Sequence, residues 1–272
     1  MSAPALDSAP RIAALPGPSR LVRISEDTWQ DLRHCLSPAD SPAADVPDPR
    51  SIAELERTGL LVDGDIEPHW RAALSAALAS PVSVRLVCVD RDRAWTSDLL
   101  VAGELVVVLD QVREVSPDDD SVRLGRRSSA VLLGLTTLEW LSATVEALVP
   151  QHPAFVPALA DSAAAGSPPP PSNGPLADAP AVAEVQVLLT TAPVAGAPAV
   201  RGRSWYALGE DAGVLATVTG DGDAQHVEQA PPGVLTTGIM GDLLTAPRQA
   251  SAAARTDAVG STAMATETEA GR

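Results

Sequence analysis

The sequence predicts an α+β fold with a central antiparallel sheet, built from two quasi-twofold-related β-β-β-α units and flanked by helical bundles. An Arg-x-Arg-x-Trp motif occurs twice, at residues 91–95 and 201–205, and Gly103 and Gly213 follow the two tryptophans at the same distance. An alternating apolar stretch, which is typical of a strand, precedes each copy at 82–87 and 182–189. This return of one pattern indicates an internal duplication.

The register of the duplication is expected to continue beyond the glycines without a gap. Leu105 corresponds to Leu215 and Val108 to Val218, and Leu-Thr-Thr recurs at 135–137 and 235–237. We expect each Leu-Thr-Thr to lie in an apolar helix that closes its unit, the first helix running from near Ser128 to Val149. A period of about a hundred residues suits a pseudo-twofold domain better than a solenoid repeat. Helices should then cover one face of a shared sheet or of two abutting sheets.

Composition divides the chain into five segments. We expect a disordered N-terminal tail, because its Ala, Pro and Ser residues offer little to bury, and a disordered C-terminal tail without apolar periodicity. Four consecutive prolines favour an extended linker between two halves of one domain. The segments are the tail 1–20, the N-terminal half 21–157, the linker 158–180, the C-terminal half 181–245 and the tail 246–272.

The first elements are a short strand at 21–24 and a helix that Ser25 caps and that continues to about Leu36. Trp29, Leu32 and Leu36 are spaced to share one face of this helix. Ser51 and Glu54 have the spacing of a capping box at the start of a second helix.

Glycines and prolines mark the elements that follow. Gly59 is expected to end the second helix, and a turn forms around Gly64. Pro68 suits the first turn of a third helix, on which Trp70, Leu74 and Leu78 form one stripe.

The resulting order of elements resembles one known family, the EspG proteins associated with type VII (ESX) secretion. The similar segments are 54–68, a Trp-bearing helix, a Val-rich strand after Pro81, then 203–206, 211–215, a Gly-Asp hairpin, Pro231-Pro232 and a helix ending at 241–244. The resemblance covers residues 21 to 244. It implies a central sheet flanked by helical bundles and a cytosolic chaperone that binds one end of a helical PE-PPE heterodimer. Such a chaperone keeps the apolar tip of the heterodimer from self-association and holds it ready for the ESX secretion machinery.

The resemblance also implies where the partner binds. The family makes its contacts through a loop between early sheet strands and through its C-terminal helical part, which correspond here to 89–95 and 234–244. This chain departs from the family in two ways: its first loop is short, and extra helices between the halves are not expected. The expected partner is therefore either a PE-PPE-like protein or another small helical secreted protein. The candidate partner-binding residues are Val89, Arg91, Arg93, Trp95, Val234, Leu235, Ile239, Met240 and Leu243.

Arg91 and Arg93 have two interpretations. Their planar guanidinium groups could pair bidentately with carboxylates of a partner. Alternatively, they flank a turn on the outer face of the sheet, with Trp95 packed on the other side.

The formal net charge of −16 argues against a nucleic-acid partner, because phosphate binding needs a basic face. An acidic membrane surface would also repel the chain. We find no basic segment followed by an apolar run at the N-terminus and no apolar run of membrane-spanning length, so we expect a cytoplasmic protein. Cys35 and Cys88 are expected to be buried free thiols rather than a disulfide.

Residues for chemistry are sparse. Asp211, Asp221, Asp223 and His226 could form a metal site, but glycines at 220 and 222 favour a hairpin turn there. Asp118 to Asp120 is expected to be a solvated loop. No nucleophile elbow or phosphate-binding glycine loop is found. The sequence therefore predicts no catalytic, cofactor or metal site and no enzyme. A generic interaction scaffold unrelated to secretion and a small-molecule enzyme remain the alternatives.

Overall fold

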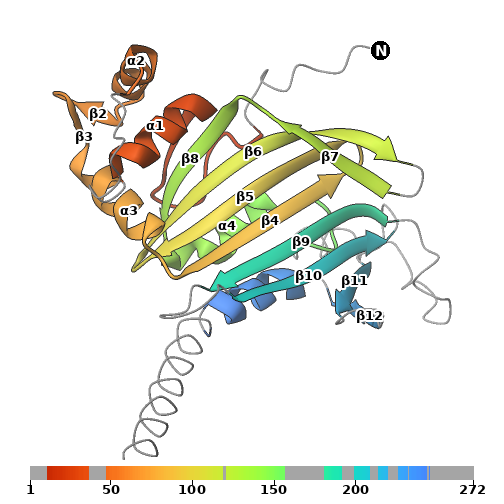
Figure 1. Cartoon of the computed structure of the whole chain (residues 1–272). Coiled ribbons are helices and arrows are strands. Elements are labelled where there is room, and N and C mark those ends of the chain that lie inside the picture. The colour runs from red at the N-terminus through yellow and green to blue at the C-terminus, as the bar shows by residue number, and fades with distance from the viewer. Residues whose placement is uncertain are drawn as a thin grey trace, which may run out of the picture.

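The computed structural model describes residues 11–36, 47–118, 121–156, 181–191, 199–208, 214–219, 226–231, 233–243 and 245. Within these residues the protein is an α+β structure around one large antiparallel sheet of ten strands (Figure 1). The strand order is β1-β8-β6-β5-β4-β9-β10-β11-β12, and β7 pairs with β6 off this path. Two short strands, β2 and β3, form a separate hairpin.

The main sheet consists of β1 (Arg20–Ser25), β4 (Val82–Asp90), β5 (Arg93–Ala102), β6 (Leu105–Asp118), β7 (Ser121–Arg127), β8 (Ala130–Thr137), β9 (Ala181–Thr191), β10 (Ala199–Leu208), β11 (Val214–Thr219) and β12 (His226–Ala230). The hairpin is β2 (Leu61–Val62) with β3 (Asp65–Ile66). The helices are α1 (Glu26–Leu36), α2 (Pro49–Arg57), α3 (Pro68–Leu78), the 3-10 turn η1 (Leu138–Trp140), α4 (Leu141–Leu148) and a C-terminal helix at 234–243.

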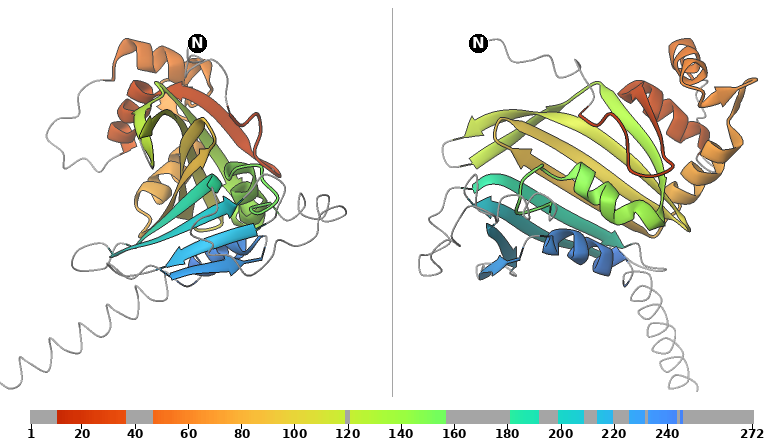
Figure 2. Two further views of the ribbon diagram at one scale, coloured as in Figure 1. Left: turned by 90° about the vertical axis from the view of Figure 1, so that its right-hand side faces the viewer. Right: turned by 180° about the vertical axis from the view of Figure 1, so that it is seen from behind.

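Helices pack on both faces of the sheet. On one face lie α4, the C-terminal helix and the N-terminal segment 11–19 (Figure 2). Their buried side chains share a hydrophobic core with β4, β5, β6 and β9. On the other face, α1, α2 and α3 cover β1, β8 and part of β6. No described helix covers β4, β9 and β10 on this second face, which Figure 1 shows from the front. We call this region the open face.

The start of α1 is capped by the expected residue, whereas the start of α2 is capped by a different one. The Ser25 hydroxyl accepts a hydrogen bond from the Thr28 amide at 3.2 Å. Helix α2 begins earlier than the capping-box spacing suggests, because Asp48 accepts from the Arg50 amide and Pro49 fills the first helical position. The Glu54 carboxylate instead binds Ser25 and Thr28, which ties α2 to the start of α1.

The predicted glycine and proline positions between α2 and β4 are confirmed. Gly59, with φ of 73°, follows the end of α2, and Asp63 and Gly64, with φ of 53° and 84°, form the β2–β3 turn. Pro68 is the first residue of α3. Trp70 and Leu74 are buried as expected, whereas Leu78 is 36 % exposed and faces the open side of the sheet.

The long helix expected from Ser128 to Val149 is wrong. Residues 130–137 form β8, and helical structure starts only at Leu138. Strand β8 is buried on both faces, so its sequence is an unbroken apolar run. Such a run lacks the alternation that would distinguish a strand from a buried helix. The Leu-Thr-Thr at 135–137 therefore lies in a strand, while its counterpart at 235–237 lies in a helix as expected.

The gapless register proposed beyond the two glycines is also wrong. Trp95 pairs with Val112 across the β5–β6 hairpin, whereas Trp205 pairs with Thr217 across the β10–β11 hairpin. The second hairpin is therefore shorter, and the equal spacing in sequence does not place equivalent residues opposite each other.

The expectation that residues 1–20 form a disordered tail fails from residue 11 onward. Ile12 and Leu15 are buried in the core beside α4. Arg11 pairs with Asp110, which is 2 % exposed, at 2.6 Å, and its guanidinium lies 4.4 Å from the centre of the Trp95 ring. The prolines and alanines of this segment made it look disordered in the sequence, because only a few of its side chains are buried.

Candidate functional site

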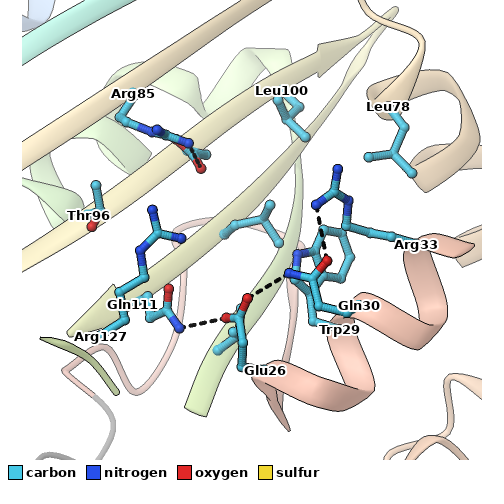
Figure 3. A pocket seen from close by; sticks show the side chains of 13 residues that line it. Glu26, Trp29, Gln30, Arg33, Leu78, Arg85, Thr96, Leu100, Gln111 and Arg127 are labelled. Atoms are coloured by element: carbon cyan, nitrogen blue, oxygen red, sulfur yellow. Dashed lines mark hydrogen bonds and ion pairs between the residues drawn. The ribbon is translucent and has the colours of Figure 1, made fainter. Parts of the chain in front are cut away.

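At the edge of the open face, a hollow of about 230 Å³ lies between α1 and the adjoining strands (Figure 3). Its lining combines apolar side chains from α1, α3 and the sheet with three arginines. We call it the arginine hollow. It is lined by Glu26, Trp29, Gln30, Arg33, Leu78, Arg85, Thr96, Asp98, Leu100, Leu109, Gln111, Arg127 and Val131.

Strand alternation places the polar residues of the hollow on one side of the sheet. In β4, Val84 and Leu86 are buried on the opposite face, so Arg85 points to the open face. The antiparallel register sets Arg85 directly opposite Asp98. The neighbouring row sets Thr96 opposite Gln111.

Arg85 and Asp98 neutralise each other in a bidentate ion pair. The guanidinium donates to both carboxylate oxygens, Nε to Oδ1 at 2.6 Å and Nη2 to Oδ2 at 2.9 Å. The hydrogen bond to Asp98 raises the pKa of Arg85 despite the opposing effect of burial. This pair is a fixed wall of the hollow.

Neutral amides hold Glu26 at the other side of the hollow. Its two carboxylate oxygens accept from Gln30 and Gln111, each at 2.7 Å. The Gln111 amide also donates to the Ser128 carbonyl at 2.9 Å, which fixes its orientation. Arg33 donates to the Gln30 side chain at 3.3 Å.

Arg127 and Thr96 have unused hydrogen-bonding capacity. Among the residues that the structure describes, none forms a hydrogen bond or ion pair with the Arg127 side chain. Figure 3 shows its guanidinium extending into the hollow, toward Thr96 and Arg85. Thr96 is 8 % exposed, and no described residue forms a hydrogen bond with its hydroxyl.

Arg113 adds positive charge beside the hollow. It pairs with Arg127 in the β6–β7 register and donates to the Gly125 carbonyl at 3.0 Å, while its buried Nε meets no acceptor in the part of the chain that the structure describes. Burial lowers the pKa of Arg113, and the charges of Arg127 and Arg85 lower it further.

A second hollow of about 200 Å³ adjoins the first along the open face. The two share Arg85, Asp98 and Leu100. Together they form an open-face groove that runs from α1 across β5, β4 and β9 to Val200 of β10, a side chain that is 60 % exposed. The second hollow is lined by Ser83, Arg85, Asp98, Leu100, Leu188, Thr190 and Val200.

The structure buries many of the residues that the sequence placed at a partner-binding surface. Trp95, Leu235, Ile239 and Leu243 belong to one hydrophobic core, and the Trp95 ring donates to the Leu148 carbonyl at 2.7 Å. Val234 and Met240 pack against the same core and are partly buried. These apolar residues hold the C-terminal helix to the sheet.

The other predicted residues lie at the β4–β5 hairpin. Val89 is half-buried, while Arg91, with φ of 55°, and Arg93 are exposed. Arg93 shares the strand face of Trp95, so the interpretation with arginine and tryptophan on opposite faces is wrong. In the second copy Arg203 lies 3.8 Å from Asp242 of the C-terminal helix.

The acidic cluster considered as a metal site lies largely outside the described residues, as do Asp119 and Asp120. Asp211, Asp221 and Asp223 are not described, and His226 is the first residue of β12. In the described part of the chain, no group of three or more His, Cys, Asp or Glu residues could hold a metal ion.

Both cysteines are free thiols, but only one is buried. Cys88 lies in the core, and burial raises the pKa of its thiol. Cys35 is exposed, which contradicts the expectation of two buried thiols. Its position near the end of α1 puts it at the protein surface.

Sequence reasoning missed Arg85, Thr96, Asp98 and Arg127. The alternation in residues 82–88 was a usable signal, because it leaves Ser83 and Arg85 on one side of a strand whose other side is apolar. What lies opposite Arg85 depends on the strand register, which the spacing alone does not give.

None of the described helices is both long and apolar enough to cross a membrane. No protein-family model matches the chain, and no curated protein matches it significantly. The side chains of the groove offer apolar surface, the Arg85–Asp98 ion pair and the Arg127 guanidinium, with which no described residue pairs.

Proposed function

We propose that this protein is a cytosolic chaperone or adaptor of a type VII (ESX) secretion system. It binds the helical tip of PE-PPE-like secreted proteins, keeps them soluble and passes them to the secretion machinery. The resemblance of residues 21 to 244 to the EspG family supports this proposal, and so does the α+β architecture with one large antiparallel sheet.

The open-face groove is the observation that carries the proposal. A helix tip that would otherwise self-associate needs a preformed apolar patch with a polar rim. The groove offers apolar side chains at Leu78, Leu100, Leu188 and Val200, with the Arg85–Asp98 pair between them. It is a shallow surface that crosses several strands, which suits a polypeptide.

A quasi-twofold arrangement of two units fits the strand order and is part of this proposal. β4 and β9 pair antiparallel at the centre, from Val82–Thr191 to Asp90–Ala183. β5, β6 and β8 follow outward from β4, as β10, β11 and β12 do from β9. Each unit then ends in a helix on the same face of the sheet. In this arrangement the central strands of both units remain free of described helices on the open face, where a partner can bind.

We infer that the partner contacts the groove together with the exposed part of the β4–β5 hairpin. Arg91 and Arg93 remain candidates for this contact because both are exposed. The buried residues Trp95, Leu235, Ile239 and Leu243 support the surface from beneath instead of forming it.

Co-expression with defined PE-PPE-like heterodimers tests the proposal. We expect the tagged protein to retain a heterodimer on an affinity column, and Val200→Arg to abolish retention because it places a charge in the groove. Val62→Arg is the matched control, because Val62 is 49 % exposed on the β2–β3 hairpin, away from the groove.

Retention that survives Val200→Arg would remove the groove from the binding site. If no such heterodimer is retained while a defined helical protein unrelated to secretion is, the protein is a generic interaction scaffold instead.

A further inference from the structure

Of the three arginines that line the arginine hollow, Arg127 is the one without a hydrogen-bond or ion-pair partner among the described residues. Arg85 is neutralised by Asp98, and each oxygen of the Glu26 carboxylate accepts a hydrogen bond from a neutral side-chain amide. Arg33 donates to Gln30 at the far side of the hollow. Arg127 has no hydrogen-bonding or ionic partner in the described part of the chain, although its guanidinium extends into the hollow.

Two buried polar atoms near Arg127 also lack a hydrogen-bond partner within the described ranges of the chain. Thr96, which is 8 % exposed, lines the hollow with its hydroxyl, and the buried Nε belongs to Arg113, which pairs with Arg127 in the β6–β7 register. Leaving a buried donor without an acceptor is costly, so native proteins rarely leave one unsatisfied. Arg127 and Thr96 are thus two unused donors in one hollow, where a single acceptor group would satisfy both.

We infer that the arginine hollow binds a carboxylate group, with the Arg127 guanidinium and the Thr96 hydroxyl as its donors, and that an acidic side chain of a bound polypeptide carries this group. The source of the carboxylate, though not the site itself, rests on the proposed function. The Arg85–Asp98 pair and the Glu26 carboxylate form the walls of the site.

The chemistry favours a carboxylate over a phosphate. A single planar guanidinium matches a single planar carboxylate in charge and in geometry. A phosphate dianion would bring a second negative charge close to Asp98 and Glu26, which line the same hollow. Arg113 strengthens the local positive potential without entering the hollow.

The shape of the site favours a polypeptide as the source. The arginine hollow continues into the second hollow along β4, β9 and β10, so a bound group can extend onto exposed apolar surface. Leu100 lies between the two hollows, and Val200 lies at the far end. An acidic residue flanked by apolar residues of the same chain fits this arrangement.

Titration with a blocked amino acid tests the site directly. We expect N-acetyl-glutamate methylamide to shift the NMR signals of the Arg127 side chain and the Thr96 amide, and the matching glutamine compound to leave them unchanged. Arg127→Gln should weaken binding about tenfold or more, because a charge-assisted pair is lost. Thr96→Val, which removes only the hydroxyl, should weaken it several-fold.

Arg126→Gln is the matched control, because Arg126 precedes Arg127 on β7, is 77 % exposed and pairs with Glu114. It should leave the titration unchanged. Equal responses in wild type and Arg127→Gln, or tighter binding of inorganic phosphate than of the glutamate compound, would overturn the assignment.

Two further comparisons separate the site from its ligand source. If glutarate or acetate binds at least about tenfold tighter than the blocked glutamate, the source is a small acid and the polypeptide assignment fails. If Arg127→Gln abolishes binding of the glutamate compound but leaves retention of a PE-PPE-like heterodimer unchanged, the site stands and its assignment to the partner fails. If the heterodimer is retained while no carboxylate binds, the proposed function stands and this inference falls.

Discussion

At the scale of single residues, Asp110 joins three distant parts of the chain. Its carboxylate accepts from Arg11 at 2.6 Å and 3.3 Å and from the Ser97 hydroxyl at 2.5 Å. Arg11 also stacks on Trp95, so the ion pair lies under an aromatic ring that shields it from water. Removing one member of such a buried pair leaves the other uncompensated.

Asp110→Asn should therefore lower the free energy of unfolding by about 3 kcal/mol. Asp98→Asn is the comparison, because its partner Arg85 is 47 % exposed and half-exposed pairs contribute only about 0–1 kcal/mol. Urea unfolding followed by tryptophan fluorescence measures both. Equal losses would show that the Arg11–Asp110 pair gains nothing from its burial.

Glu54 gives the stability a dependence on pH. Burial raises the pKa of Glu54, but hydrogen bonds from Thr28 and Ser25 and the charge of Arg57 outweigh it, so its pKa lies below the ordinary value of 4.5. A carboxyl with a lowered pKa stabilises the fold above its unfolded-state pKa, and this contribution is lost as the pH falls through the folded-state pKa.

Glu54→Gln should thus reduce stability at neutral pH and should flatten the loss of stability on acidification. Urea midpoints measured from about pH 6 to about pH 3 for both proteins test this. A wild type and a variant that lose stability in parallel over that range would contradict the assignment.

At the scale of elements, Gly134 of β8 makes room for the N-terminal segment. A Cβ at this position would lie 2.5 Å from the Leu15 side chain and 3.3 Å from Val108. Leu15 is 5 % exposed and has little space to move. The close approach of segment 11–19 to the sheet therefore depends on a glycine.

Gly134→Ala should lower the free energy of unfolding by about 1–3 kcal/mol, the usual cost of overpacking. Hydrogen exchange should also accelerate in residues 11–19 before it does in β4. Gly241→Ala is the control, because a Cβ at that helical position meets no atom within 4 Å. Unchanged exchange in the segment would show that Leu15 is not held by this contact.

Elements whose ends carry local signals could be predicted from the sequence. Gly59, the Asp63-Gly64 turn and Pro68 each act on their own backbone, so their effect does not depend on distant residues. Strand β8 could not be predicted, because burial on both faces removes the alternation that identifies a strand. Asp48 displaced Ser51 as the cap of α2, since Pro49 fits the first helical position better.

The candidate site was less accessible to prediction than the fold. Its side chains come from α1, α3, β4, β5, β6, β7 and β8, and they meet only through strand register. The aromatic and apolar residues chosen from sequence, such as Trp95 and Leu235, have the chemistry of a binding surface and also of a core. Here the core contains them, because α4 and the C-terminal helix cover that face.

At the scale of the whole molecule, the two halves share one sheet and one core. The β4–β9 pairing joins them along the full length of β4, and side chains from both halves pack together beneath it. The connection between the halves is therefore not needed to hold them together once the protein is folded.

A protease site inserted between residues 158 and 180 tests this unity. After cleavage the two fragments should elute together in size-exclusion chromatography and should separate only in denaturant. Val187→Asp should release them without denaturant, because Val187 is 5 % exposed at the shared core. Separation of the wild-type fragments after cleavage would show that β4 and β9 do not hold the halves together.

The position of Arg11 has a consequence for protein synthesis. Its hydrogen bonds reach Asp110 and the Ala147 carbonyl, 99 and 136 residues further along the chain. A ribosome synthesises Arg11 before these partners, so the N-terminal segment leaves the exit tunnel before the residues that bind it exist. We expect the nascent chain to remain able to bind ribosome-associated chaperones until α4 has been translated. Only then can the segment 11–19 dock on the core of the first half.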